Sequence, residues 1–317
     1  MMYEPQWWVL KGWLLKGRIL KGFCLVSLLV CIALPSQAAD SKRLKVLTTI
    51  RPLALLVQDV AGEAAEVEVL LTGAASPHHY TLRVSDIQKV QAADLLVWLG
   101  PEFERFLTRT LAPADSGQLL TLATLPGLQW PTVAESNDRT GHDGTGHDHA
   151  GRDLHLWISP ANGAVILTAI AGRLTELRPE MSQQFAGNLA KAQAELVIAS
   201  AAVKEDLAPL SERGFGVGHD AFRHFVAYFN LNQLAAVSEM PDQSLSARHL
   251  METAQELKSA HCLIVEAGEP AFATARLERL FKIPIVKADP LALNPEIDTY
   301  AALITDLGQS FEECLGR

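Results

Sequence analysis

The chain has 317 residues, of which 49% are hydrophobic and 20% are charged, and its formal net charge at pH 7 is −9. This composition provides ample material for a sizeable core, in one large domain or in two of ordinary size. The acidic balance argues against nucleic acid or an anionic membrane as a partner, because both bind basic patches. It suits a cation.

The first 39 residues predict a cleavable signal peptide. Four basic residues precede an uncharged run over residues 23–34, and small residues follow at Ser36 and Ala38. The apolar run is short for a membrane span. This leader holds four basic residues and one acidic residue, so its removal changes the net charge from −9 to −12. We therefore expect an exported, acidic protein.

After the leader, short apolar runs alternate with amphipathic stretches. The expected strands are 44–50, 65–71 and 94–100, and the expected helices are 52–61, 85–93 and 101–111. Strands that alternate with helices imply βαβ units and a parallel sheet. A polar, glycine-rich segment over residues 135–153 interrupts this pattern and is expected to be a loop.

A long helical region follows from residue 162 to about 207, with an interruption near Pro179. Its second part runs for roughly 28 residues without a strong breaker, or about 42 Å of helix. The alternation then resumes, with expected strands at 215–220, 231–238, 261–268 and 282–290. The sequence thus predicts an α/β fold with two parallel-sheet lobes, residues 40–178 and 211–317, joined by a rigid linker helix over 179–210.

Four metal-ligating side chains fall at or near the ends of expected strands: His78 in GAASPHHY, His155 in DLHLWISP, His219 in GFGVGHD and Asp289 in IVKADP. In open α/β sheets, ligands bind beyond the carboxyl ends of the strands, and here that is the cleft between the lobes. Three imidazoles and one carboxylate suit Zn²⁺, although imidazole also suits copper and nickel. The alternative is a set of scattered structural histidines, with His155 hydrogen-bonded inside the core.

Coordinating histidines need an acceptor at the second ring nitrogen, and Glu239 and Glu266 are candidates for this role.

The cysteines predict a disulfide. Cys24 and Cys31 leave with the signal peptide, so the mature chain keeps only Cys262 and Cys314. Two cysteines in an oxidising compartment predict one disulfide, and the alternative is a pair of buried free thiols.

Several stretches of the mature chain carry a family resemblance. They are residues 73–107, DLHLWISP, VGHDAFRHF, SARHL and ADPLALN, together with Cys262 and Cys314. Taken in order, they resemble the periplasmic zinc-binding proteins of bacterial zinc-uptake ABC transporters, within the wider cluster A-I family of metal-specific substrate-binding proteins. The resemblance implies two α/β lobes joined by a long helix, with the metal between them.

Position by position, the resemblance implies metal ligands at His78, His155, His219 and Asp289, and a disulfide between Cys262 and Cys314. It further implies a periplasmic location, Zn²⁺ as the transported ligand, and a membrane permease of an ABC transporter as the partner. We expect a monomer that is not an enzyme and does not bind nucleic acid.

The chain departs from the family pattern in two places. His79 follows His78 directly, so the first ligand position offers two histidines. The histidine loop is short, and it is either a collector of metal ions or a solvated acidic linker; its histidines are His142, His147 and His149.

Two other functions remain open. One is a manganese- or iron-binding receptor of the same family, but His219 favours zinc because manganese members carry Glu at that position. The other is a secreted zinc hydrolase. The sequence contains no His-Glu-x-x-His and no Gly-x-Ser-x-Gly motif, so it gives hydrolysis no support.

Overall fold

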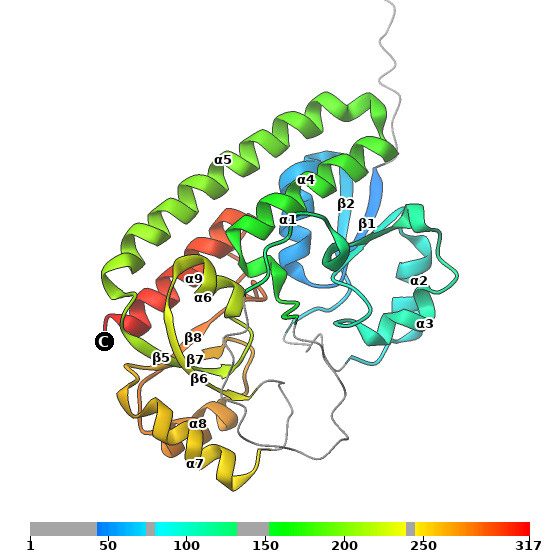
Figure 1. The fold of residues 1–317 in the computed structure, drawn as a ribbon. Coiled ribbons are helices and arrows are strands. Elements are labelled where there is room, and N and C mark those ends of the chain that lie inside the picture. Colours follow the sequence, from blue (N-terminus) through cyan, green and yellow to red (C-terminus); the bar gives the residue numbers. More distant parts are fainter. Residues whose placement is uncertain (1–42, 74–79, 132–151, 239–244) are drawn as a thin grey trace, which may run out of the picture. The chain divides into compact units, whose positions relative to one another are not determined.

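Two four-stranded parallel sheets form the framework of the part of the chain that the computed structural model describes, which is residues 43–73, 80–131, 152–238 and 245–317 (Figure 1). The expected signal peptide, His78, His79, Glu239 and the three histidines of the loop lie outside these residues. Within the described ranges, no helix combines the length and the hydrophobicity needed to cross a membrane.

The first sheet has the strand order β2-β1-β3-β4. Its strands are β1 Leu44–Thr48, β2 Ala65–Val69, β3 Leu95–Trp98 and β4 Leu119–Thr121. The helices of this half are α1 Arg51–Ala61, α2 Val84–Ala92 and the short α3 Thr108–Leu111. All strand pairs are parallel, as the alternation of strands and helices predicted.

The second sheet repeats this topology in the order β6-β5-β7-β8. Its strands are β5 Gly214–His219, β6 Asn232–Ser238, β7 Leu263–Glu266 and β8 Ile285–Ala288. Its helices are α6 Arg223–Phe229, α7 Ala247–Glu256, α8 Ala271–Phe281 and α9 Tyr300–Leu315. In β7, Ile264 packs into the main core, whereas Leu263 and Val265 belong to a smaller cluster on the opposite face of the sheet.

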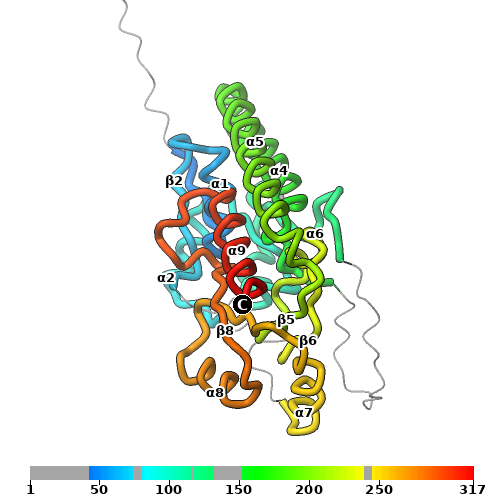
Figure 2. The backbone as a smooth tube through the Cα atoms, turned by 90° about the vertical axis from the view of Figure 1, so that its left-hand side faces the viewer, coloured from blue at the N-terminus to red at the C-terminus, as the bar shows by residue number. Residues whose placement is uncertain are grey.

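Two helices connect the sheets. After α4 Pro160–Leu177, the chain turns at Pro179 into α5 Ser182–Leu207, a helix of 26 residues. Helix α5 packs against α1 and α4 of the first half and against α9 of the second (Figures 1 and 2). Asn188 of α5 also donates to the carbonyl oxygen of Val60 at 2.9 Å. The predicted long helix that links the two halves is therefore confirmed.

Helix α9 meets the beginning of α4 in a close junction. The Tyr300 hydroxyl donates to the carbonyl oxygens of Trp157 at 2.6 Å and Ser159 at 3.1 Å. A Cβ atom at Gly163 would come within 2.3 Å of the Tyr300 ring, so this contact requires glycine. The fully buried Tyr300 therefore joins an element of the second half to the segment that carries His155.

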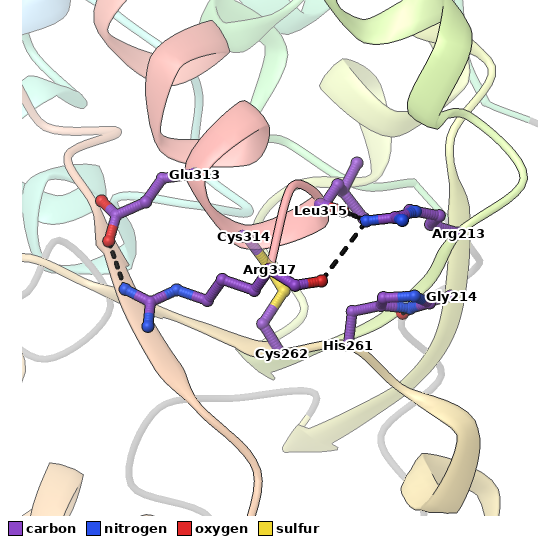
Figure 3. The surroundings of a disulfide bond; sticks show 8 residues. All are labelled: Arg213, Gly214, His261, Cys262, Glu313, Cys314, Leu315 and Arg317. Atoms are coloured by element: carbon purple, nitrogen blue, oxygen red, sulfur yellow. Dashed lines mark hydrogen bonds and ion pairs between the residues drawn. A yellow bond between two sulfur atoms is a disulfide. The ribbon is translucent and has the colours of Figure 1, made fainter.

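The expected disulfide between Cys262 and Cys314 is present (Figure 3). It joins the residue before β7 to the last turn of α9, and the two Cα atoms are 5.5 Å apart. Both cysteines are fully buried. Near them, Arg213 donates to the carbonyl oxygens of Leu315 and Arg317, so several contacts fix the end of the chain to the start of the second sheet.

The structure differs from the sequence prediction in three places. Residues 101–111 form a turn, a 3₁₀ segment and the short α3 rather than one helix, because the Glu104 side chain turns inward to accept the backbone N–H groups of Leu99 and Gly100. Strand β4 was not predicted. The DLHLWISP segment is a 3₁₀ turn at Leu156–Ile158 that leads into α4, so His155 does not end a strand.

Candidate metal centre

His155 is the predicted site residue of the first half, and its own loop orients it. Its Nδ1 atom lies 2.6 Å from Oδ1 of Asp153, and its backbone N–H donates to the same oxygen at 3.0 Å. The rings of Phe103 and Trp157 pack against the imidazole, which belongs to a residue only 8% exposed. Apolar contacts and one carboxylate therefore hold this ring in a fixed orientation.

The charge balance between these two residues decides the tautomer of His155. Burial by itself lowers the pKa of His155, but the charge and hydrogen bond of Asp153, together with the charges of Glu266 and Asp220, raise it above the ordinary value. Burial raises the pKa of Asp153, yet the attraction of His155 prevails and lowers it to about 2. An ionised carboxylate only accepts, so Nδ1 carries the proton and Nε2 is the acceptor nitrogen of the neutral ring.

His219 ends β5 in the second half, and a neighbouring strand orients it. Its Nδ1 atom lies 2.5 Å from Oε1 of Glu266, which ends β7 next to β5 in the sheet. Burial by itself raises the pKa of Glu266, but the hydrogen bond and charge of His219, together with the charge of His155, lower it below the ordinary value. The expected contact of Glu266 with a ring nitrogen of a candidate ligand is present, and because this contact engages Nδ1 of His219, Nε2 is the nitrogen that faces away from Glu266.

The two histidines come together although 64 residues separate them in the sequence. Their ring centroids are 5.2 Å apart and the ring planes are inclined at 74°. Each residue is 8% exposed. One imidazole belongs to the segment that follows the first sheet, and the other belongs to the second sheet, so the meeting point lies between the two halves.

Asp289 follows directly after β8, at the carboxyl ends of the strands of the second sheet, where His219 and Glu266 also lie. Its neighbour Ala288 pairs with Glu266, the residue that contacts His219. Oδ2 of Asp289 accepts the backbone N–H of Asn294 at 2.8 Å, whereas Oδ1 is buried and has no hydrogen-bond partner. A buried, unpaired carboxylate oxygen is costly unless a cation or a donor reaches it.

The described residues do not make a complete metal site by themselves. Among them, no group of three or more His, Cys, Asp or Glu side chains is arranged to hold a metal ion. The structure brings His155 and His219 together and places Asp289 directly after β8, two strands away from the β5 strand that carries His219, while the first predicted ligand, His78, lies outside the described residues. Sequence reasoning missed Asp153, although its position two residues before His155 in RDLHL was a usable signal.

A comparison with known protein families now adds to this geometry. The family described as "Zinc-uptake complex component A periplasmic" matches residues 46–314 of the chain. The chain belongs to this family. Membership identifies it as a periplasmic zinc-binding component of a zinc-uptake system, as the sequence resemblance predicted, with Zn²⁺ as its ligand.

Two members of the zinc-uptake family match this chain over most of their length. The high-affinity zinc uptake system protein ZnuA of Yersinia pestis is 30% identical over 290 residues, which cover 85% of this chain and 91% of that protein. The protein of the same name from Haemophilus ducreyi is 31% identical over 292 residues, covering 85% and 93%. The structure of the periplasmic zinc binding protein TroA from Treponema pallidum shares the fold, with a TM-score of 0.73 at 19% identity, covering 87% of this chain and 100% of that one.

Proposed function

We propose that this chain captures one Zn²⁺ ion between its two halves and delivers it to the permease of an ABC transporter. The observation that carries this proposal is the pair His155 and His219. Their rings come from different halves, the ring centroids are 5.2 Å apart, and each ring faces a carboxylate through Nδ1. Carboxylates at the second nitrogen of coordinating histidines fix ring orientation and raise ligand basicity.

The proposed ligand set consists of His78, His155, His219 and Asp289. Nitrogen ligands bind zinc at about 2.0–2.1 Å and carboxylate oxygens at about 2.0–2.2 Å, in a tetrahedral arrangement. Oδ1 of Asp289, which is buried without a partner, supplies the oxygen. Three neutral imidazoles and one carboxylate leave a formal charge of +1 on the occupied site.

The carboxylates beside the histidines support binding rather than catalysis. A catalytic zinc site needs an open water position and a general base near it. Asp153 and Glu266 instead face Nδ1 of their histidines, where they orient the ring. We therefore propose that the chain is not an enzyme. We also propose that it acts as a monomer and binds no nucleic acid, in keeping with its acidic charge.

Titration of the purified mature protein, prepared without chelator or affinity tag, tests the proposal. We expect one equivalent of Zn²⁺ to bind in preference to Mn²⁺. We expect His155→Ala and His219→Ala each to weaken zinc binding by about 100-fold, because loss of a ligand should cost at least the upper end of the range for residues that only orient ligands. His261→Ala is the control, since His261 lies beside Cys262 at the opposite end of β7 from Glu266 (Figure 3).

Preferential retention of manganese would contradict the assignment to zinc. Unchanged zinc affinity in both site variants would contradict the proposed ligands. Steady turnover of peptide, ester or phosphate substrates that disappears in His155→Ala would show that the chain is an enzyme instead.

A further inference from the structure

The segment that begins with Asp289 makes hydrogen bonds to the opposite half of the molecule. We call residues 289–299, between β8 and α9, the Asp289 loop. Trp157 lies two residues after His155 in the first half, and its indole N–H donates to the carbonyl oxygen of Pro290 in the loop at 2.7 Å. Just beyond the loop, Oδ2 of Asp59 in α1 accepts the backbone N–H of Tyr300 at 3.0 Å. The loop therefore connects the two halves at the metal centre.

Arg51 makes the largest share of these contacts. It is the first residue of α1, and its guanidinium donates to four backbone carbonyl oxygens of the Asp289 loop: those of Ala292, Asn294 at 2.7 Å, Pro295 at 3.3 Å and Ile297 at 2.6 Å. No carboxylate of the described residues forms an ion pair with Arg51. Five N–H donors in one rigid plane allow a single side chain to hold several carbonyls in fixed relative positions.

The Asp289 loop has a conformation that needs such support. Ala292 has a φ of 52°, in the left-handed region that alanine rarely adopts. Its N–H donates to the carbonyl oxygen of Asp289 at 3.2 Å, and the N–H of Asn294 donates to Oδ2 of the same residue at 2.8 Å. Arg51 holds the carbonyl oxygens of both Ala292 and Asn294. The two residues that fix the Asp289 backbone and carboxylate are thus fixed in turn by Arg51.

We propose that Arg51 is a positioning residue for zinc: by holding the Asp289 loop against α1, it orients the Asp289 carboxylate so that Oδ1 faces the metal position. This inference rests on the proposed function, in which Asp289 is a ligand. Arg51 does not touch the ion. It acts through Asn294, and it fixes a ligand of the second half to the half that carries His155.

A double-mutant cycle tests this role. Arg51→Met, Arg51→Lys, Asp289→Ala and the combination of Arg51→Met with Asp289→Ala are compared for zinc affinity by competition with a chromophoric chelator. We expect Arg51→Met to weaken binding by about 10-fold, the lower end of the effect of residues that orient metal ligands. Arg51→Lys keeps the charge but not the planar set of donors, so its effect is expected to be intermediate. In the Asp289→Ala background, Arg51→Met is expected to cause no further loss.

Cobalt provides a readout that a general structural role would not change. With Co²⁺ in place of zinc, Arg51→Met is expected to alter the visible absorption bands in the same direction as Asp289→Ala. Arg213→Met is the matched control, because Arg213 also donates to backbone carbonyls, those of Leu315 and Arg317, but at the far end of the second sheet (Figure 3). Its zinc affinity and cobalt spectrum should match those of the unmodified protein.

Equal weakening by Arg51→Met with and without Asp289 would overturn the proposal, and so would unchanged affinity in Arg51→Met. If thermal unfolding shows that Arg51→Met does not fold, the same cycle is run with Arg51→Lys. Failure of the unmodified protein to bind zinc is a different result, because it contradicts the proposed function rather than the role of Arg51.

Discussion

The two halves of the molecule share one strand order but orient their site histidines in different ways. In the first half, His155 lies outside the sheet, and its carboxylate partner Asp153 comes from the same loop two residues earlier. In the second half, His219 ends β5, and its partner Glu266 comes from the adjacent strand β7, 47 residues later. The same chemical pair is thus built locally in one half and by strand pairing in the other.

The halves also differ in what stabilises their sheets. In the first, the buried Glu104 accepts hydrogen bonds from Thr49 at 2.6 Å and from the amides of Leu99 and Gly100, and so ties together the ends of β1 and β3. In the second, the Cys262–Cys314 disulfide joins β7 to α9 at the opposite ends of the strands from the histidine. A strand of the sheet thus carries the histidine in the second half, whereas a segment outside the sheet carries it in the first.

The largest expected effect comes from removing the disulfide. Replacing both Cys262 and Cys314 by Ala should lower the free energy of unfolding by about 4 kcal/mol, because the bond closes a loop between residues 52 apart in the sequence. Zinc affinity of the folded protein should not change, since the bond lies at the far end of β7 from Glu266. Chemical unfolding with and without reductant measures the first effect, and metal titration measures the second.

Reduction of the unmodified protein should reproduce the loss, and the double variant should not respond to reductant. A large fall in zinc affinity together with the fall in stability would show that the disulfide holds the metal centre itself. That result would contradict the expectation that the disulfide and the metal centre, at opposite ends of the second sheet, are independent of each other.

The next effect concerns Glu104 in the first half. Burial raises the pKa of Glu104 from the ordinary value of 4.5 to about 7, although hydrogen bonds from Thr49, Gly100 and Leu99 partly offset this rise. A raised pKa in the folded state favours the protonated form. Protonated Glu104 therefore contributes its full stability to the folded state below the unfolded pKa near 4.5, and this contribution is lost as pH rises through about 7. The shift in pKa between the unfolded and folded states corresponds to roughly 3 kcal/mol of folding free energy.

Glu104→Gln removes this titration, so the stability of the unmodified protein relative to the variant should fall between pH 5 and pH 8. Denaturant unfolding across that range measures it. Glu102→Gln serves as the control, because Glu102 is exposed and lies two residues earlier. A difference between Glu104→Gln and the unmodified protein that stays constant with pH would contradict the prediction.

The smallest expected effect separates the two ways of orienting a histidine. Asp153→Asn and Glu266→Gln should each weaken zinc binding by about 10-fold, because each removes the charge that fixes the Nδ1–H tautomer. Calorimetric titration of both variants measures the losses. Asp94→Asn is the control, since Asp94 accepts a backbone N–H of Lys45 in the first sheet, away from the histidines. Unchanged affinity in either variant would mean that packing alone orients that ring.

Much of the fold was predictable from the sequence because short, mainly apolar runs alternate with helical stretches. All seven predicted strands and the linker helix are present. Strand β4 was missed because three residues, Leu119–Thr121, are too few to show a periodic pattern. The helix expected over 101–111 failed because the inward hydrogen bonds of Glu104 are tertiary contacts that local amphipathicity does not reveal.

The candidate site was predictable to a smaller degree. The residue types and the family resemblance pointed to His155, His219 and Asp289, and the structure brings the two imidazoles together. The partner of His155 was within reach of sequence reasoning because Asp153 is local. The pairing of Glu266 with His219 needed the register of β5 and β7, and the contacts of Arg51 with a loop more than 240 residues away needed the complete fold.

Helix α5 has a consequence for how the proposed permease partner would recognise the zinc-loaded protein. One continuous helix packs against α1 and α4 of the first half and against α9 of the second, so it acts as a spacer between the two sheets. We therefore expect zinc binding to change the local surface around the His155, His219 and Asp289 segments more than the separation of the sheets. Under the proposed function, a permease would then recognise the zinc-loaded protein from that local surface rather than from its overall shape.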